Sequence, residues 1–158
     1  MLEFLIGIPR SGKSTYCTHL RLDSYHQPLV IEFDEIRKIL HNGVYSQYGE
    51  LITKSHGLLM AQIALKSGMH VVLDDTFTNP FNCQTVFKID KGAKATWIPN
   101  FQTYLVGTLL DEHIDLCIQR AKKLNQEYLI KVIYKTAKQA SILANTYGES
   151  LDELRNVI

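Results

Sequence analysis

The chain has 158 residues, of which 46% are hydrophobic, and its 17 Lys and Arg against 16 Asp and Glu give a formal net charge of +1. This length and composition predict a single compact domain over residues 1–158, which leaves no room for a second catalytic domain. The near-neutral charge excludes a globally basic nucleic-acid coat protein, so any contact with a polyanion must come from a local patch.

The cysteines indicate a reducing environment. Cys17, Cys83 and Cys117 are far apart and odd in number, and they lack the paired spacing of a zinc site. We therefore expect reduced thiols in a cytosol-like compartment. The short apolar run at the N-terminus follows no basic stretch, and no segment reaches the length of a membrane span. The expectation is a soluble, unprocessed, cytoplasmic protein that binds no membrane, in the host cytoplasm if the source is viral.

The first element is an apolar strand that runs directly into a phosphate-binding pattern. Gly7, Gly12, Lys13 and Ser14 have the spacing of the Walker A motif, G-x-x-x-x-G-K-S. Glycines let backbone N–H groups approach phosphate oxygens, Lys13 supplies a point charge, and the Ser14 hydroxyl can ligate Mg²⁺ at a helix start. The predicted ATP-binding residues are therefore the whole loop: Gly7, Pro9, Arg10, Ser11, Gly12, Lys13, Ser14 and Thr15.

Strand and helix patterns alternate after this loop. A helix is predicted over 14–22, followed by a buried strand over 29–33 that Asp34 caps. A short helix over 35–40 ends at Asn42-Gly43. A long amphipathic helix over 50–67 stops at Gly68.

The second half is predicted in the same way. A third strand covers 70–74, Asn79-Pro80 opens a helix, and the 90s are irregular around Gly92 and Pro99. A fourth strand is predicted over 103–107. Two helices follow, over 111–121 and 126–144, joined by the polar segment 122–125.

This alternation predicts an α/β protein with three α/β/α layers, a parallel sheet of about four to five strands, and a helical region at the C-terminus. Ligands of such sheets bind beyond the carboxyl ends of the strands. The segments at those ends are the Walker loop, Asp34 and the run from Asp74 to Thr76. We therefore expect these three segments to surround one site.

Asp34 is the predicted general base. A carboxylate beyond the second strand would face the γ-phosphate, where an acceptor hydroxyl must lose its proton. The alternative is an ordinary helix N-cap. Arg37 lies three residues later on the same helical face and would hold Asp34 or grip an acceptor phosphate. Its alternative is a surface ion pair.

Asp74 and Asp75 end a strand that resembles a Walker B strand, whose terminal acid supports the metal or its waters. We place Asp75 with Ser14 at the metal, although the sequence leaves open which of the two acids has that role. A plain cap at the strand end remains the alternative for either.

Arg120, Lys122 and Lys123 lie where the chain passes between the last two helices. Cations there could close over the triphosphate as an intramolecular arginine finger, and Arg120 is the preferred residue. The alternative is a solvated basic helix end.

The motifs together resemble the kinase domain of phage-type polynucleotide kinases. The matching segments are Gly7 to Thr15, Phe33 to Arg37 and Leu73 to Pro80, and the likeness extends over roughly residues 1–145. The resemblance implies that Asp34 activates a 5′-hydroxyl, that Arg37 contacts the acceptor phosphate, and that Asp75 and Thr76 line the acceptor site. Lys13, Ser14 and Arg120 carry over as phosphate, metal and lid residues.

Two positions depart from the family. Arg10 replaces a small residue, and Leu124, beside Lys123, stands where the family has a second lid arginine. The prediction is a kinase that uses ATP and Mg²⁺ to phosphorylate a 5′-hydroxyl of DNA or RNA. Alternatives are a kinase of hydroxymethylated pyrimidine bases in DNA, a zeta-toxin-like small-molecule kinase, and a non-enzymatic nucleotide-binding switch.

Overall fold

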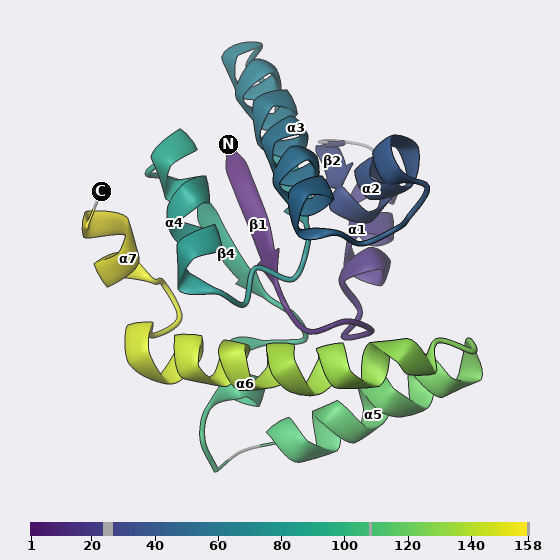
Figure 1. Ribbon diagram of the computed structural model, residues 1–158. Helices are drawn as coiled ribbons and strands as arrows, with labels where there is room; N and C mark the ends of the chain where they lie inside the picture. The colour runs from purple at the N-terminus through teal and green to yellow at the C-terminus, as the bar shows by residue number, and fades with distance from the viewer. Residues whose placement is uncertain (24–26, 108, 158) are drawn as a thin grey trace.

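A computed structural model describes residues 1–23, 27–107 and 109–157. Within these residues the strands form one four-stranded parallel sheet in the order β2-β3-β1-β4. The strands are β1 (Leu2–Ile6), β2 (Leu29–Glu32), β3 (Val71–Asp74) and β4 (Lys94–Trp97). Because all four run in parallel, their carboxyl ends meet at one edge of the sheet (Figure 1).

Helices cover both faces of this sheet. Alternate β1 residues divide between two apolar clusters, so Phe4 packs with α3 (Gln47–Lys66) and α4 (Pro80–Ile89), whereas Leu5 packs with Cys17 of α1 (Lys13–Leu22). This alternation follows from the period of two in a strand. The predicted three-layer α/β/α fold is therefore confirmed.

The main core lies between the sheet and α3 and α4. The Phe4 ring stands edge-on to the rings of Phe77 and Phe87, with centroids 5.4 and 5.5 Å apart. The helix α2 (Phe33–His41) follows β2 directly, and its first residue, Phe33, is 1% exposed in the same core. The Phe33 ring contacts Phe77 edge-on at 5.9 Å. Aromatic packing therefore joins the ends of β2 and β3.

The C-terminal region lies across the carboxyl edge of the sheet. The helices α5 (Leu110–Lys123) and α6 (Ile130–Tyr147) run side by side below the end to which β1 points (Figure 1). Two short 3-10 turns, η1 (Phe101–Tyr104) and η2 (Glu127–Leu129), precede α5 and α6. The last helix is α7 (Asp152–Asn156). This arrangement confirms the predicted helical region and places it over the expected site.

Several predicted helix boundaries are confirmed. The Asn79 side chain accepts a hydrogen bond from Phe81 N, and Pro80 is the first residue of α4. Asn42 ends α2 with φ of 52°, and Gly68, with φ of 78°, follows the end of α3. A positive φ is the conformation for which Gly and Asn are preferred after a helix.

The predicted fourth strand is wrong. Residues 103–107 form the end of η1 and a turn. The fourth strand is instead β4, which pairs with the free side of β1 and lies in the region predicted to be irregular. A short apolar run does not distinguish a strand from another buried segment. Tyr104 is fully buried because it packs against Trp97 and His113, whereas β4 is an edge strand whose exposed Lys94 weakens the apolar pattern.

Three smaller expectations at helix ends also differ. α2 begins at Phe33 with Glu32 at the N-cap, so Asp34 lies inside the first turn and is not the cap. α5 continues through Lys123, because Arg120, Lys122 and Lys123 suit the negative end of a helix. The helix predicted over 126–144 begins only at Ile130, and α7 was not predicted at all.

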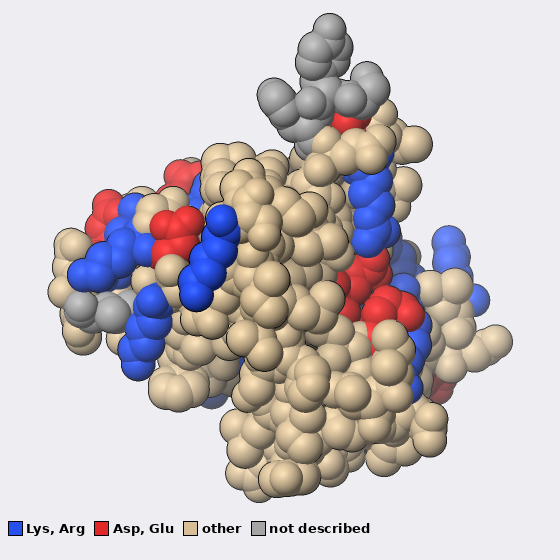
Figure 2. Space-filling model, turned by 90° about the horizontal axis from the view of Figure 1, so that it is seen from above, with Lys and Arg blue, Asp and Glu red and all other residues tan. Residues whose placement is uncertain are grey.

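Two features of the surface are the apolar character of its helices and the distribution of charge on one face of the molecule. Among the described residues, none of the helices combines the length and apolar character that crossing a bilayer requires. Figure 2 looks onto the edge of the sheet at which β1 begins. Basic and acidic side chains are mixed there in two groups, separated by a broad uncharged surface. Charge on this face is therefore balanced locally.

A substitution on α3 tests the packing beside the site. A Cβ atom at Gly57 would lie 2.6 Å from Cε1 of Phe33, closer than any real contact. Gly57→Ala gains about 1 kcal/mol of helix propensity, but forcing the buried Phe33 ring to move costs about 2–3 kcal/mol, the upper part of the range for overpacked cores. We expect the free energy of unfolding in urea to fall by roughly 1–2 kcal/mol. His56→Ala, at the exposed neighbouring position, should change it by less than about 0.5 kcal/mol. Equal stability of Gly57→Ala and wild type would contradict the packing described.

Candidate active site

The Walker loop forms a tight bend between β1 and α1. A Cβ atom at Gly7 would lie 2.7 Å from the Ile98 carbonyl oxygen and 2.7 Å from Ser11 Oγ. Gly12, at the N-cap of α1, has φ of 112°, which only glycine adopts readily. Arg10 also has a positive φ, of 68°. Glycine is therefore required at Gly7 for space and at Gly12 for backbone conformation.

Neighbouring segments hold the start of this loop in place. Gly7 N donates to the Thr76 carbonyl oxygen at 3.2 Å, which ties the loop to the segment after β3. The buried Tyr104 hydroxyl accepts from Ile8 N at 3.4 Å and donates to the Ile98 carbonyl oxygen at 2.5 Å. Tyr104 therefore connects the loop to the end of β4. Sequence reasoning missed this role because it placed Tyr104 in a strand.

Two side chains connect the loop to the C-terminal helices. Arg120 Nη1 on α5 donates to the Arg10 carbonyl oxygen at 3.0 Å. The Arg10 guanidinium in turn donates to the side-chain carbonyl of Gln126, which follows α5. The structure thus places Arg120 against the Walker loop. Gln126 was not predicted, and nothing in its local sequence marks it.

Lys13 lies at the bottom of the loop. Its side chain is buried, and Nζ donates to the carbonyl oxygens of Gly7 at 2.9 Å and Ile8 at 3.0 Å. Burial lowers the pKa of Lys13, and three carboxylates oppose this effect: Asp74, Asp75 and Asp34. The charged side chains that follow β1, β2 and β3 are therefore close together around Lys13, as expected for the carboxyl ends of parallel strands.

The remaining predicted loop residues surround this lysine. Pro9 is half-buried and Ser11 is buried within the bend. Ser14 and Thr15 are exposed in the first turn of α1, so the Ser14 hydroxyl is accessible for a metal ligand. The first N–H groups of a helix have no partners within it and attract anions.

The two acids at the end of β3, Asp74 and Asp75, lie near different helices. Asp74 lies beside α1, with Oδ2 3.7 Å from Cys17 Sγ, and burial raises its pKa to about 6 against the opposing effect of Lys13. Asp75 accepts from Thr76 N at 2.8 Å, and burial raises its pKa while Lys54 of α3 opposes the rise. Asp74 therefore lies on the side of α1 and the Walker loop, and Asp75 lies on the side of α3.

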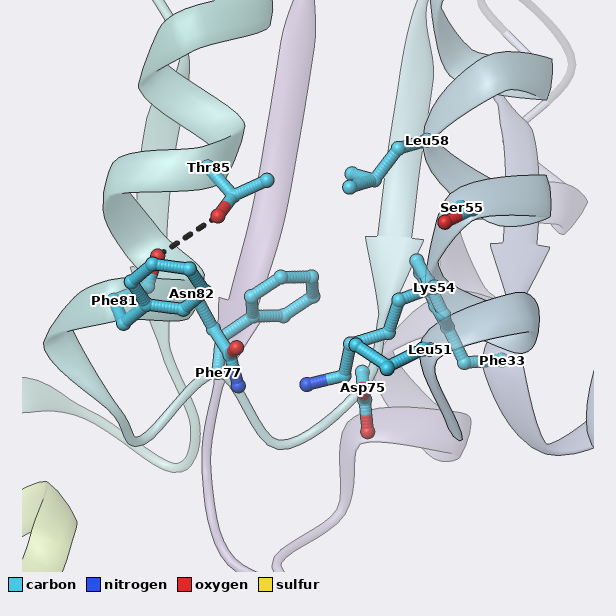
Figure 3. Close-up of a pocket in the computed structure, with 10 residues that line it drawn as sticks. All are labelled: Phe33, Leu51, Lys54, Ser55, Leu58, Asp75, Phe77, Phe81, Asn82 and Thr85. Atoms are coloured by element: carbon cyan, nitrogen blue, oxygen red, sulfur yellow. Dashed lines mark hydrogen bonds between the residues drawn. The ribbon is translucent and has the colours of Figure 1, made fainter. Parts of the chain in front are cut away.

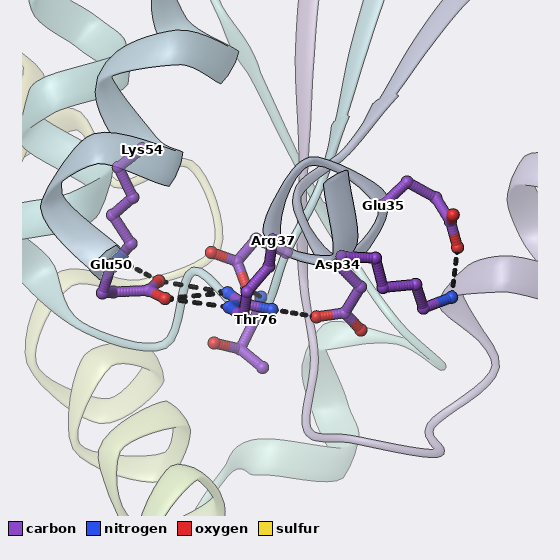
Figure 4. A network of polar contacts seen from close by, with 8 residues as sticks. Asp34, Glu35, Arg37, Glu50, Lys54 and Thr76 are labelled. Carbon is purple, nitrogen blue, oxygen red and sulfur yellow. Dashed lines mark hydrogen bonds and ion pairs between the residues drawn. The ribbon is translucent and has the colours of Figure 1, made fainter. Parts of the chain in front are cut away.

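Asp34 is exposed but held by an ion-pair network (Figure 4). Its side chain is 81% exposed and accepts from Arg37 Nη1. Arg37, at 15% exposure, also donates from Nε to Glu50 Oε2 at 3.0 Å and from Nη2 to Oε1 at 3.2 Å. Two hydrogen bonds between a guanidinium and one carboxylate hold the guanidinium in one orientation. Arg37 is therefore held by Glu50 and is not only a surface ion-pair partner of Asp34.

The sequence did not predict that Glu50 forms the ion pair that holds Arg37. Glu50 lies in the first turn of α3, where acids are ordinary, and it is separated from Arg37 by the turn between α2 and α3. Lys54, one turn further, lies 4.0 Å from Glu50 Oε1. The four residues Asp34, Arg37, Glu50 and Lys54 form a row that we call the acceptor row.

The fold has known counterparts among solved structures. A chain in the structure of the Pnkp1/Rnl/Hen1 RNA repair complex superposes with a TM-score of 0.74 at 16% identity, covering 94% of this chain. A gluconokinase from Sinorhizobium meliloti gives a TM-score of 0.52 at 14% identity, covering 99% of this chain and 92% of that chain. The chain has the fold of the P-loop kinases.

A third similar structure with the P-loop kinase fold is a putative kinase from Chloroflexus aurantiacus, with a TM-score of 0.55, 14% identity, and coverage of 82% of this chain and 73% of that chain. The present chain spans 46% of the matched chain of the RNA repair complex. No protein-family model and no curated protein matches the sequence. These neighbours support the P-loop kinase fold in general and not the phage type in particular.

A buried histidine of α5 packs against η1. His113 is 7% exposed, its ring stands edge-on to Tyr104 at 5.9 Å, and Nε2 lies 3.7 Å from Cys117 Sγ. Burial, and to a lesser degree the charges of Arg120 and Lys13, lower the pKa of His113 to about 4. The imidazole is therefore neutral in the folded protein.

This histidine predicts a pH dependence of stability. Because the pKa of His113 in the folded state lies below its ordinary value, its contribution is fully present above about pH 6.5 and is lost as the pH falls toward about 4. We expect the free energy of unfolding to drop by about 1–2 kcal/mol between pH 7 and pH 5 from this group. In His113→Gln, urea titrations at both pH values should show a correspondingly smaller drop. An unchanged drop in the variant would remove His113 as its cause.

Proposed function

We propose that this chain is a Mg²⁺-dependent kinase that transfers the γ-phosphoryl group of ATP to a 5′-hydroxyl of DNA or RNA. The observation that carries the proposal is the placement of Asp34, which is exposed yet oriented by Arg37 and lies within electrostatic range of Lys13. A carboxylate in that position can meet an acceptor hydroxyl beside a phosphate-binding lysine. The 5′-hydroxyl acceptor rests on the motif resemblance and on the likeness to the repair-complex chain.

The Walker loop suits a triphosphate. Its cradle has no room for a side chain at Gly7, and within the described part of the chain the buried Lys13 ammonium donates its hydrogen bonds to the loop carbonyls of Gly7 and Ile8. Lys13 would exchange these carbonyls for phosphate oxygens, while the N–H groups at the start of α1 would hold the anion. Arg120 is close enough to the loop, through Arg10, to balance charge that develops on the phosphates.

The residues present also fit Mg²⁺. The ion takes few protein ligands and is held largely by phosphate oxygens and water, which agrees with the absence, within the described residues, of a cluster of three metal-binding side chains. The Ser14 hydroxyl and one acid after β3 would hold it. Asp74 is the better placed acid, because it lies on the Walker side, whereas Asp75 faces α3. When bound, Mg²⁺ would neutralise charge on the transferred group.

The acceptor side would act through four residues. Asp34 takes the proton of the attacking hydroxyl while the oxygen of that hydroxyl forms a bond to the γ-phosphorus. The bond between the γ-phosphorus and the β-γ bridging oxygen breaks, and ADP is released. Arg37 keeps Asp34 oriented and offers its charge to an acceptor phosphate. Asp75 and Thr76 line the same side, next to the acceptor row.

A small-molecule kinase is the second candidate, because the gluconokinase matches the present chain over nearly the full length of both. The hydroxymethylpyrimidine kinase and the nucleotide-binding switch share the same donor site. These candidates differ only in the acceptor, so the acceptor must be tested directly.

The test is transfer of radiolabelled γ-phosphate from ATP to a panel of acceptors. The panel contains 5′-hydroxyl DNA and RNA, DNA with internal hydroxymethyluracil, nucleosides and gluconate. We expect label at the 5′ ends of the oligonucleotides. Label on internal modified bases or on gluconate alone would replace the proposed acceptor, and phosphate released only to water would indicate the switch.

Two substitutions separate the donor and acceptor roles. Asp34→Asn should leave the affinity for ATP within about twofold of wild type and lower kcat by roughly a hundredfold or more, because only the proton acceptor is lost. Lys13→Ala is the matched comparison and should weaken both ATP binding and turnover. Full transfer activity in Asp34→Asn would exclude Asp34 as the base.

A further inference from the structure

A pocket opens between α3 and α4 beside the proposed acceptor site (Figure 3). It encloses about 190 Å³. The buried rings of Phe33 and Phe77 lie at its base, and Leu58 contributes an apolar wall. Phe81 and Leu51 form part of the lining although they are 68% and 65% exposed. Apolar side chains therefore stand open to solvent around a small cavity.

The pocket is polar at one end only. Figure 3 shows the Lys54 ammonium and the Asn82 amide pointing toward one another at the end that holds Asp75. The Asp75 carboxyl lies close enough to Lys54 for the lysine charge to oppose the rise of its pKa. A ligand in this pocket would thus meet aromatic and aliphatic surface along its body and hydrogen-bonding groups at the end nearest the site.

The acceptor row connects this polar end to the proposed base. Lys54 lies 4.0 Å from Glu50, Glu50 holds Arg37 at 2.9 Å, and Arg37 donates to Asp34. Every member of the row except Asp34 is largely buried. A series of ion pairs therefore links Lys54 in the pocket to Asp34.

We propose that this pocket binds a nucleobase near the 5′ end of the acceptor strand, an inference that rests on the proposed function. A base has apolar π-faces that pack against aromatic side chains, and its polar edge can pair with groups such as the Asn82 amide and the Lys54 ammonium. The sugar and phosphate attached to it would extend along the acceptor row toward Asp34.

A polyhydroxylated acceptor fits the same pocket poorly. Its hydroxyl groups would lose water against Phe33, Phe77 and Leu58 without gaining partners there, which is unfavourable. The pocket thus distinguishes acceptors that carry a base from sugar acids. It also gives this face of the chain a role in substrate selection that the Walker loop cannot provide.

The test compares two fluorescently labelled 5′-hydroxyl oligonucleotides, one with normal bases and one with abasic residues at its first two positions. Equilibrium binding, measured by anisotropy without ATP, should be about tenfold tighter for the oligonucleotide that carries bases. Ser55→Trp places a large ring in the pocket from an exposed position on α3, and Phe81→Ala removes an exposed aromatic ring from its lining. Each should reduce this difference to about twofold or less. Met60→Trp, exposed on α3 outside the pocket, is the matched control and should preserve it.

Equal binding of both oligonucleotides by wild type, or a tenfold difference that survives both pocket substitutions, would overturn the inference. Failure to bind either oligonucleotide would overturn it as well. The same protein is assayed for phosphate transfer to the two oligonucleotides. A base preference in binding without any transfer would instead contradict the proposed function and leave the pocket assignment standing.

Discussion

The tight packing around Gly7 is the constraint on which the site depends. The bend after β1 has no space for a Cβ atom, since it lies against the Ile98 carbonyl and is tied by Gly7 N to Thr76. The ends of β1, β3 and β4 are therefore fixed against one another by backbone contacts and by the Tyr104 hydroxyl. A loop held in this way can present N–H groups to an anion without first becoming ordered, which is what preorganised electrostatic binding requires.

The charged residues near this bend lie on two sides of it. Lys13 and Asp74 lie on the side of α1, where the donor phosphates and the metal would bind. Asp75 and the acceptor row lie on the side of α3, and Arg37 joins Asp34 to Glu50 across the turn between α2 and α3. Asp74 and Asp75 are adjacent at the end of β3, so the two sides meet at that strand end. In the proposed function, the acceptor is selected on the side of α3.

Much of this site could be predicted from the sequence, because its parts are local. The Walker loop is contiguous, and Asp34 and Asp74 follow apolar strands whose carboxyl ends must meet in a parallel sheet. Contacts between distant segments were not predictable. Glu50 resembles any acid in a first helical turn, and Tyr104 lies in an apolar run that is buried by packing under the loop instead of by strand pairing. Short apolar runs and single polar side chains carry too little local signal to reveal such partners.

The most direct measurement is a crystal structure of the chain with Mg²⁺, a non-hydrolysable ATP analogue and a 5′-hydroxyl dinucleotide. The account predicts phosphates in the bend between Gly7 and Ser14, with the acceptor hydroxyl within about 2.6–3.2 Å of the Asp34 carboxylate. An empty bend, or an acceptor hydroxyl bound away from Asp34 with the carboxylate facing solvent, would contradict it.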